Sequence, residues 1–419
     1  MQIDNRKTVI IVDPYSSGNL FLDEFHKRGC RVVAVLTAPK PPDVYASSYK
    51  EDGFDKIFVS SEWILVDLVD VLREFKPIYV FAGCESGVEL ADQLAPPLLD
   101  DRFNDPELAA ARRDKWEMAK AVANAGVPVM RQICSKNFSD VQAWVRKSNL
   151  VNTSLVVKPP KSASTDSVVK VNGDAELEVE FLKLIGKKNR LGIINDMVLV
   201  QEYLEGQEYV VDTFSFGGVH TLCSVCKYTK ISNNNGMAIY DRMDWIDYDD
   251  QVVADLFLYA EDVLNAVGIR WGSAHIEIMW TTCGPRLIEL AARPHGGGHP
   301  KLSYLATGDS TVHRTVEYFV NGVEPPRNYY LFEHMVVVFF RAECLSVVVG
   351  VDRLYSLNSL PSYLDSLIKV KDNDLIPATV DLFGTLAIGF VVLKNRSRDQ
   401  IEKDICEIRL IESLVFQCQ

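Results

Sequence analysis

The sequence predicts a multidomain protein of α/β and α+β class, with a doubly wound domain at its N-terminus. Over residues 1–104, short apolar runs alternate with helical stretches, which is the pattern of β-α-β units. Residues 186–320 are instead rich in strands and contain one clear helix, at Gln251–Val267. With 419 residues, the chain is also too long for a single small core.

The composition limits the classes of function. Hydrophobic residues make up 47% of the chain and charged residues 24%, as in ordinary soluble globular proteins. A net charge of −13 without a compensating basic run argues against a nucleic-acid partner. No apolar stretch approaches the ~20 residues of a membrane span, so no membrane partner is expected, and the N-terminus lacks the layout of a signal peptide.

The nine cysteines are scattered without a disulfide framework, and their number is odd. This usage predicts a reducing, cytoplasmic compartment. Cys223 and Cys226 form a CxxC in a strand-like run that has no second pair. Two buried or half-buried thiols are therefore favoured over a functional motif.

Residues 1–104 are predicted to form the N-terminal domain. The segment "DPYSSGN", from Asp13 to Asn19, lacks the lysine and glycine spacing of a phosphate-binding loop, so a tight strand-to-helix turn is favoured. The predicted strands lie at residues 7–13, 31–36, 56–59 and 78–82.

A second unit is predicted over residues 105–185. Asp105 and Pro106 suit the start of a helix, which we expect to continue to Gly126. This helix carries several basic residues, and a plain solvated face is favoured over a functional one. Further along, "SLVVKPPKSASTDSVVKV" places Lys158 at the end of a strand, followed by a polar loop and a return strand.

The segment Trp271–Pro300 reads as a hairpin with its turn at TTCGP. If the hairpin is symmetric about Cys283, Glu277 faces Glu289 on one side of the sheet, while Ile276, Ile278, Ile288 and Leu290 face the other. Two opposed carboxylates are destabilising unless burial raises one pKa or a divalent cation bridges them. An exposed hairpin with scattered acidic residues is the less favoured alternative.

Arg293 is followed by a loop with three glycines between His295 and His299. Glycines allow close approach of the backbone and present N–H groups to an anion. A flexible loop holds two metal ligands poorly, and the sequence shows no third one nearby. Substrate contact is therefore favoured over a metal site, and plain loop chemistry is favoured over both.

A second hairpin is expected within Asp196–Gly218. A planar base could lie against the segment that links its strands, and Glu208 could accept hydrogen bonds from ribose hydroxyls. Any β-hairpin has this appearance, so the pattern alone indicates little.

Taken together and in order, five segments of roughly residues 1–320 resemble the ATP-grasp superfamily. Within it, "GCESGVELADQLA", "KPPKSASTDS" and "ELAARPHGGG" make the chain most similar to the L-amino acid ligases. The five segments are RDK at 113–115, VVKP at 156–159, QEYLEGQEY at 201–209, IEI at 276–278 and IELAAR at 288–293.

The resemblance implies an ATP-grasp fold. It would have an N-terminal Rossmann-like domain, a small subdomain over residues 105–185, a large one over 186–320 and a C-terminal α+β domain over 321–419.

For the nucleotide, the resemblance implies that Lys158 and Lys115 reach the ATP phosphates. Residues 161–167, with Ser164 and Thr165, would close over them. Family members usually have glycines in this loop, whereas SASTDS has none, so its closure would be stiffer.

The same resemblance places the adenine base against Glu202, Tyr203 and Leu204, and the ribose on Glu208.

For the chemistry, Glu277 and Glu289 would bind Mg²⁺, with Mn²⁺ as an alternative. Arg293 would act with Lys158 as a catalytic residue that stabilises the developing acyl phosphate. The family usually has an asparagine where this chain has Ala291, so a site with two glutamates remains.

The substrate would contact Arg293, His295, Gly296, Gly297 and Asp241, with the segment 233–245 as a substrate loop. A plain surface loop is the equal alternative there.

The implied function is ATP-dependent ligation of a carboxylate to an amine, forming an amide between small-molecule substrates such as amino acids. The alternatives are an ATP-grasp carboxylase, a purine-pathway ligase, and an ATP-binding protein without catalysis. A homodimer is the default expectation for the assembly.

Overall fold

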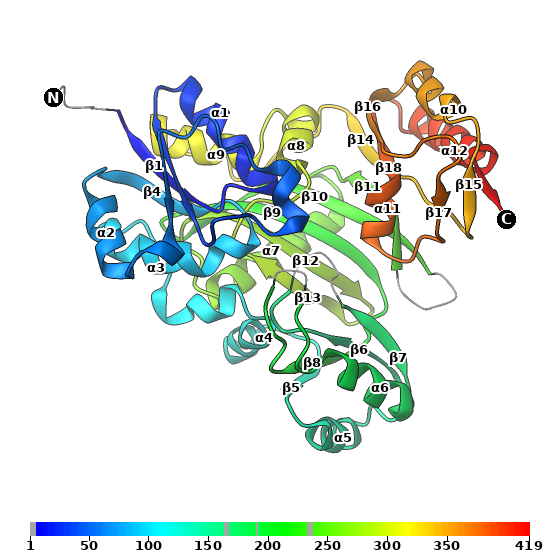
Figure 1. Ribbon diagram of the computed structural model, residues 1–419, viewed down its shortest axis with the longest axis horizontal. Coiled ribbons are helices and arrows are strands. Elements are labelled where there is room, and N and C mark those ends of the chain that lie inside the picture. The colour runs from blue at the N-terminus through cyan, green and yellow to red at the C-terminus, as the bar shows by residue number, and fades with distance from the viewer. Residues whose placement is uncertain (1–5, 163–166, 190–191, 233–237) are drawn as a thin grey trace.

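The computed structural model describes residues 6–162, 167–189, 192–232 and 238–419. Ser164 and Thr165 lie outside the described residues. The ribbon in Figure 1 shows an N-terminal sheet, a long central sheet, and two smaller sheets. None of the helices in the described residues is long and apolar enough to cross a membrane.

The N-terminal sheet has four parallel strands in the order β3-β2-β1-β4, as the sequence predicts. The strand "TVIIV" is buried on both faces, which is why it reads as a continuous apolar run. Helices cover the two faces, and Phe21 and Phe25 of one helix pack on Phe81. The elements are β1 Thr8–Val12, α1 Leu20–Lys27, β2 Arg31–Leu36, β3 Lys56–Val59, α2 Leu65–Arg73, β4 Pro77–Ala82 and α3 Val88–Leu98.

The second sheet is antiparallel, with strand order β5-β8-β6-β7. The long helix predicted from Asp105 is interrupted, because residues 106–112 form a 3-10 turn. An α-helix then starts at Lys115, where the Asp114 side chain accepts from two backbone N–H groups. The elements are α4 Lys115–Asn124, β5 Gln132–Ser135, α5 Phe138–Lys147, β6 Ser154–Lys158, β7 Val169–Asn172, α6 Asp174–Leu184 and β8 Val198–Glu202.

The central sheet has eight strands in the order β13-β12-β9-β10-β11-β14-β18-β16. Helix α7 packs on one face, where Leu256 and Val263 meet Ile276 and Ile278. Segment 238–245 is a strand of this sheet, so its interpretation as a loop is wrong. The elements are β9 Gln207–Phe216, β10 Val219–Ser232, β11 Ala238–Trp245, α7 Gln251–Ala266, β12 Gly272–Thr281, β13 Gly284–Ala291, α8 His299–Thr307, α9 Thr311–Val316, β14 His334–Phe339, β16 Tyr363–Ile368 and β18 Gly389–Asn395.

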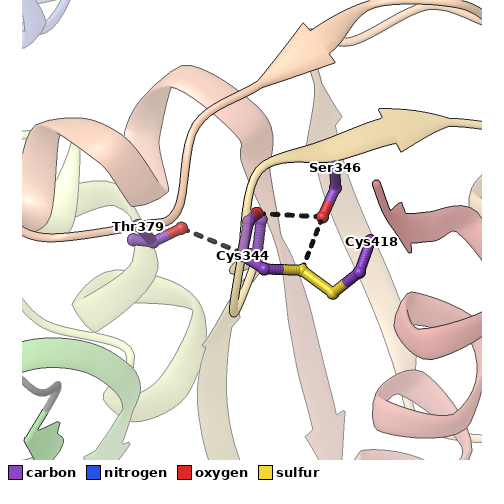
Figure 2. The surroundings of a disulfide bond; sticks show 5 residues. Cys344, Ser346, Thr379 and Cys418 are labelled. Atoms are coloured by element: carbon purple, nitrogen blue, oxygen red, sulfur yellow. Dashed lines mark hydrogen bonds between the residues drawn. A yellow bond between two sulfur atoms is a disulfide. The ribbon is translucent and has the colours of Figure 1, made fainter.

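The C-terminal region adds a small sheet in the order β17-β15-β19. A disulfide joins Cys344 to Cys418, with Cα atoms 5.7 Å apart, beside Ser346 (Figure 2). The sequence did not indicate this pairing, whereas Cys223 and Cys226 are buried free thiols as expected. The elements are β15 Ser346–Val348, α10 Asp352–Tyr355, β17 Leu375–Ile376, α11 Leu382–Ile388, α12 Arg398–Val415 and β19 Phe416–Cys418.

Candidate functional site

A cavity of about 640 Å³ lies where the second sheet, the central sheet and the N-terminal sheet meet. Among the described residues that the sequence singled out for a site, all except Asp241 line it. These are Lys115, Lys158, Glu202, Tyr203, Leu204, Glu208, Glu277, Glu289, Arg293, His295, Gly296 and Gly297.

Glu277 of β12 and Glu289 of β13 are directly opposite each other, as the hairpin register predicts. The predicted register also holds for Ile276 opposite Leu290, but it fails between this pair and the turn, because a bulge shifts Ile278 to face Leu287 instead of Ile288. Ile288 therefore lines the cavity, while Ile276 and Ile278 are fully buried in the core below. The hairpin is not an exposed surface feature.

The two glutamates have different neighbours. Burial alone would raise the pKa of Glu277, but the His275 side chain, 3.4 Å away, outweighs it and lowers the pKa to about 2. Glu289 forms an ion pair with Lys115, whose Nζ is 2.9 Å from its Oε1. Glu277 thus stays ionised in spite of its burial, which is consistent with the predicted site for a hard cation between the two carboxylates.

Two lysines face the same cavity from different elements. Lys115 begins α4 and donates to the carbonyl oxygen of Ser162 at 2.9 Å. Lys158 ends β6 and is 5% exposed. Burial, and then the nearby charge of Lys115, lower the pKa of Lys158 to about 8. An anion bound between Lys115 and Lys158 would offset the repulsion between their two positive charges.

Glu208 lies on β9 and accepts two hydrogen bonds from Lys230, each 2.7 Å long. Burial alone lowers the pKa of Lys230, but the Glu208 charge outweighs it and raises the pKa above its usual value. The sequence analysis missed Lys230. Strand alternation could have found it, because Lys230 and Tyr228 share one face of β10 and both line the cavity.

Arg293 reaches the cavity from the end of β13 and is held by the N-terminal region. Its Nε donates to Glu85 at 3.1 Å, and Arg113 lies 3.5 Å from the other oxygen of Glu85. Burial alone would raise the pKa of Glu85, but the two arginines outweigh it and lower the pKa. Sequence reasoning missed Glu85, although it lies in the quoted segment "GCESGVELADQLA".

Three histidines converge on one buried carboxylate behind the glutamates. Asp212 accepts from Nδ1 of His275 and His295 at 3.1 and 3.2 Å. Nδ1 of His299 lies 3.3 Å from the Asp212 carboxylate and forms a hydrogen bond with the Ser303 hydroxyl. The sequence predicts no third metal ligand near the glycine loop, and this prediction is wrong. Asp212, His275 and His295 together have donor atoms that could hold a metal ion.

The rings nevertheless stack, with centroids 4.0 and 3.8 Å apart, and each Nδ1 already has an acceptor. Hydrogen bonding explains the histidine cluster without a metal.

The protonation of the histidines follows from their partners. Burial lowers the pKa of His275, but hydrogen bonds with Asp212 and Glu277 outweigh it and raise the pKa to about 9. Burial, and then the His275 charge, lower the pKa of His295 to about 4. Neutral His295 donates to Asp212 and accepts from the Tyr228 hydroxyl at 3.1 Å.

The glycine loop is anchored on the N-terminal region. The N–H groups of Gly297 and Gly298 donate to the hydroxyls of Ser16 and Ser17, at 3.3 and 2.9 Å. These two amides, which the sequence analysis offered to an anion, already have partners. Gly298 has φ of +76° where α8 begins, a conformation that favours glycine.

Asp241 does not belong to this cavity. Its carboxylate pairs with Arg409 at 2.9 Å and with Arg341 at 3.1 Å, toward α12. Asp241 is therefore not placed for the predicted substrate contact in this cavity. The register with β10 shifts at Asp241, because Thr229 pairs with Arg242 whereas Lys230 pairs with Tyr240. Tyr240 and Met243 of the same strand do line the cavity.

Comparison with known proteins gives the chain its relatives. A sequence model of the ATP-grasp domain matches residues 151–300. Dapdiamide A synthase of Enterobacter agglomerans is 28% identical over 316 residues, which cover 75% of this chain and 74% of that protein. The L-arginine-specific L-amino acid ligase of Bacillus subtilis is 24% identical over 197 residues, 47% of this chain and 46% of its own.

Solved structures share the fold at low identity. An L-amino acid ligase from Bacillus licheniformis superposes with a TM-score of 0.72 at 15% identity, covering 96% of this chain and 97% of its own. An N5-carboxyaminoimidazole ribonucleotide synthetase in complex with ADP gives 0.67 at 16% identity, covering 97% and 96%.

Proposed function

Since this chain is an ATP-grasp ligase related to the L-amino acid ligases, we propose that it joins the carboxylate of one substrate to the amine of an amino acid, with ATP as the energy source. The observation that carries the proposal is the convergence of Lys115, Lys158, Arg293 and two opposed glutamates on one cavity. Such a set can neutralise a phosphoryl group in transfer and then an oxyanion.

In the first step, the substrate carboxylate attacks the γ-phosphorus of ATP, the bond to the β-γ bridging oxygen breaks, and ADP leaves with an acyl phosphate formed. Lys115 and Lys158 provide fixed positive charge beside the phosphates. In the second step, the amine attacks the acyl carbon, inorganic phosphate leaves, and the amine loses its proton to solvent. Arg293, oriented by Glu85, stabilises the oxyanion of this step.

Glu277 and Glu289 fit a resident Mg²⁺, because two carboxylates of opposed strands offer hard oxygen ligands and the pKa of Glu277 is low. Mn²⁺ is the alternative ion. When bound, such an ion would neutralise phosphate charge. His275 holds Glu277 in its ionised form from behind.

The nucleotide base would lie at the end of the cavity formed by β8 and its link to β9. Glu202 is fixed there by Arg131, whose Nε donates at 2.7 Å, so its backbone is the part available to a base. Tyr203 and Leu204 follow Glu202 along the cavity. The Glu208 carboxylate would accept hydrogen bonds from the ribose hydroxyls in addition to those from Lys230.

The experiment is a screen of amino-acid pairs with ATP and Mg²⁺, in which nucleotides are resolved by chromatography and amides by mass spectrometry. We expect ADP and phosphate in equal amounts with a dipeptide, and a hydroxamate of the acyl partner when hydroxylamine replaces the amine. AMP as the nucleotide product contradicts the acyl-phosphate route. ADP release that needs bicarbonate instead of an amine would favour the carboxylase alternative, and ATP binding without turnover would favour a non-catalytic protein.

A further inference from the structure

The cavity continues beyond the glutamates toward the C-terminal region. Four elements contribute to this end, namely β11, β14, β18 and α11. Figure 1 shows α11 beside β11 and β18, and Leu382 and Leu386 of this helix line the cavity. Of the described residues that these four elements place on the cavity, each is apolar or aromatic: Tyr240, Met243, Val337, Phe339, Leu382, Leu386 and Phe390. We call this set the apolar wall.

The charged residues of the same strands turn away from the apolar wall. Asp241 and Asp244 of β11 both pair with arginines instead of lining the cavity. Tyr240 and Met243 are three positions apart, and they share the cavity face because the register with β10 shifts at Asp241. This bulge separates one charged face from one apolar face within a few residues.

Part of the apolar wall is only half-buried. Leu382, Leu386 and Phe390 pack against the core that holds Met243 and Val337, but each keeps an accessible part. Apolar surface that lines a concave space gains free energy when an apolar group displaces water from it.

The opposite side of the cavity, at the N-terminal region, is polar. Ser16, Asn19 and Ser48 line it. The two ends flank Arg293 and the glycine loop, so a ligand held at the glutamates can extend toward a polar or an apolar surface.

From this arrangement we infer that one of the two joined substrates is an amino acid with a large apolar side chain, of the leucine, methionine or phenylalanine class, which packs on the apolar wall. The inference rests on the proposed function and specifies its substrate class. A side chain with a charge would lose its water there without finding an ionic partner on the wall.

The first test measures kcat/KM for dipeptide formation by the wild-type protein over a series of amino acids. We expect a rise of about 10-fold or more from alanine to leucine or methionine, because each methylene adds to the apolar contact. Aspartate and lysine should react at least ~100-fold more slowly than methionine. Faster turnover with charged amino acids would overturn the inference.

The second test fills the space with Leu386→Trp. This variant should reduce kcat/KM for methionine by about 10-fold or more relative to kcat/KM for alanine, because the large side chain competes with the tryptophan for space. The matched control is Leu410→Trp on α12, where the leucine is 55% exposed, and it should match the wild type. Equal losses for alanine and methionine would contradict the assignment.

Thermal unfolding of both variants shows whether the fold is kept. If Leu386→Trp fails to fold, Phe390→Leu enlarges the same end and should shift the optimum toward larger side chains; an unchanged optimum overturns the inference. A wild-type protein that makes no ADP with any pair contradicts the proposed function itself, whereas ADP formed only with polar pairs contradicts this inference alone.

Discussion

Arg293 and Glu85 form a buried ion pair between two regions that are 208 residues apart in the sequence. Glu85 also lies beside Arg113 and is 1% exposed, so one carboxylate orients a cavity arginine from the N-terminal region. The pair connects the N-terminal sheet to the site that we propose for acyl transfer.

The first prediction concerns this pair. Glu85→Gln should lower kcat by roughly 10- to 100-fold with little change in KM for ATP, because Arg293 loses its orienting partner. Steady-state kinetics and a melting curve check this. Glu89→Gln is the matched control, since Glu89 pairs only with Lys161 among the ion pairs described and is exposed. An unchanged kcat in folded Glu85→Gln would show that Arg293 does not need it.

The second prediction concerns the opposed glutamates. Glu277→Gln and Glu289→Gln should each abolish turnover at ordinary Mg²⁺ while the melting temperature stays near that of the wild type. Loss of one carboxylate removes half of the proposed ligand charge. Titration of activity with Mg²⁺ is the measurement, and Glu205→Gln in the exposed turn after β8 is the control. Normal Mg²⁺ dependence in either variant contradicts the cation site.

The third prediction compares two lysines of one segment. Lys158→Ala should reduce kcat/KM for ATP by about 100-fold or more, because a charge fixed at a strand end is lost. Lys161→Ala should change it little, since the Lys161 side chain is 39% exposed and pairs with Glu89 at the surface. Equal effects of the two substitutions on kcat/KM for ATP would contradict a specific role for Lys158 in binding the ATP phosphates.

The fourth prediction is a pH dependence. Lys158 has a pKa of about 8 in the free protein, so it is charged below this pH and neutral above it. Since kcat/KM reports on the free enzyme, kcat/KM for ATP should fall as the pH rises through about 8. Lys158→Arg keeps its charge and should move this fall to higher pH. A profile that is flat from pH 7 to 9.5 in the wild type would be inconsistent with the buried lysine binding phosphate.

The fifth prediction concerns the disulfide. Cys344 and Cys418 are 74 residues apart in the sequence, and closing a loop of this length stabilises the fold by about 4 kcal/mol in the chain-entropy account. Cys418→Ser, or added reductant, should therefore lower the free energy of unfolding in a denaturant titration. Cys406→Ser, which removes an exposed free thiol of α12, should leave it unchanged. If Cys418→Ser and the reduced protein unfold at the same denaturant concentration as Cys406→Ser and the wild type, the disulfide contributes nothing to stability.

The sequence predicts best those features that depend on strand periodicity. Glu277 and Glu289 could be paired because residues of a strand alternate at a period of 2, and the apolar stripe fixes the register. The bulge at Ile288 could not be predicted, because one inserted residue leaves the composition of the strand unchanged. The position of Asp241 was missed for a related reason, since segment 238–245 was interpreted as a loop and a bulge at Asp241 breaks the alternation of the strand.

Long-range partners were beyond the sequence. Glu85 meets Arg293 and Lys230 meets Glu208 only because the sheets bring distant segments together. Asp212 likewise gathers three histidines, from a strand, a loop and the start of α8. Each of these residues has an ordinary local context, so only tertiary packing shows its role.

The pairing of β11 with β14 has a consequence for protein engineering. Arg242, Met243 and Asp244 of β11 pair with Val338, Val337 and Val336 of β14. This pairing joins the part of the central sheet that carries Glu277 and Glu289 to the strands β14, β18 and β16. Hydrogen bonds across a seam of main chain do not depend on side-chain identity. A chimera that exchanges the chain from β14 onward would therefore replace every residue of the apolar wall except Tyr240 and Met243, and should alter substrate preference. Truncation before β14 would instead leave β11 as an open edge prone to aggregation.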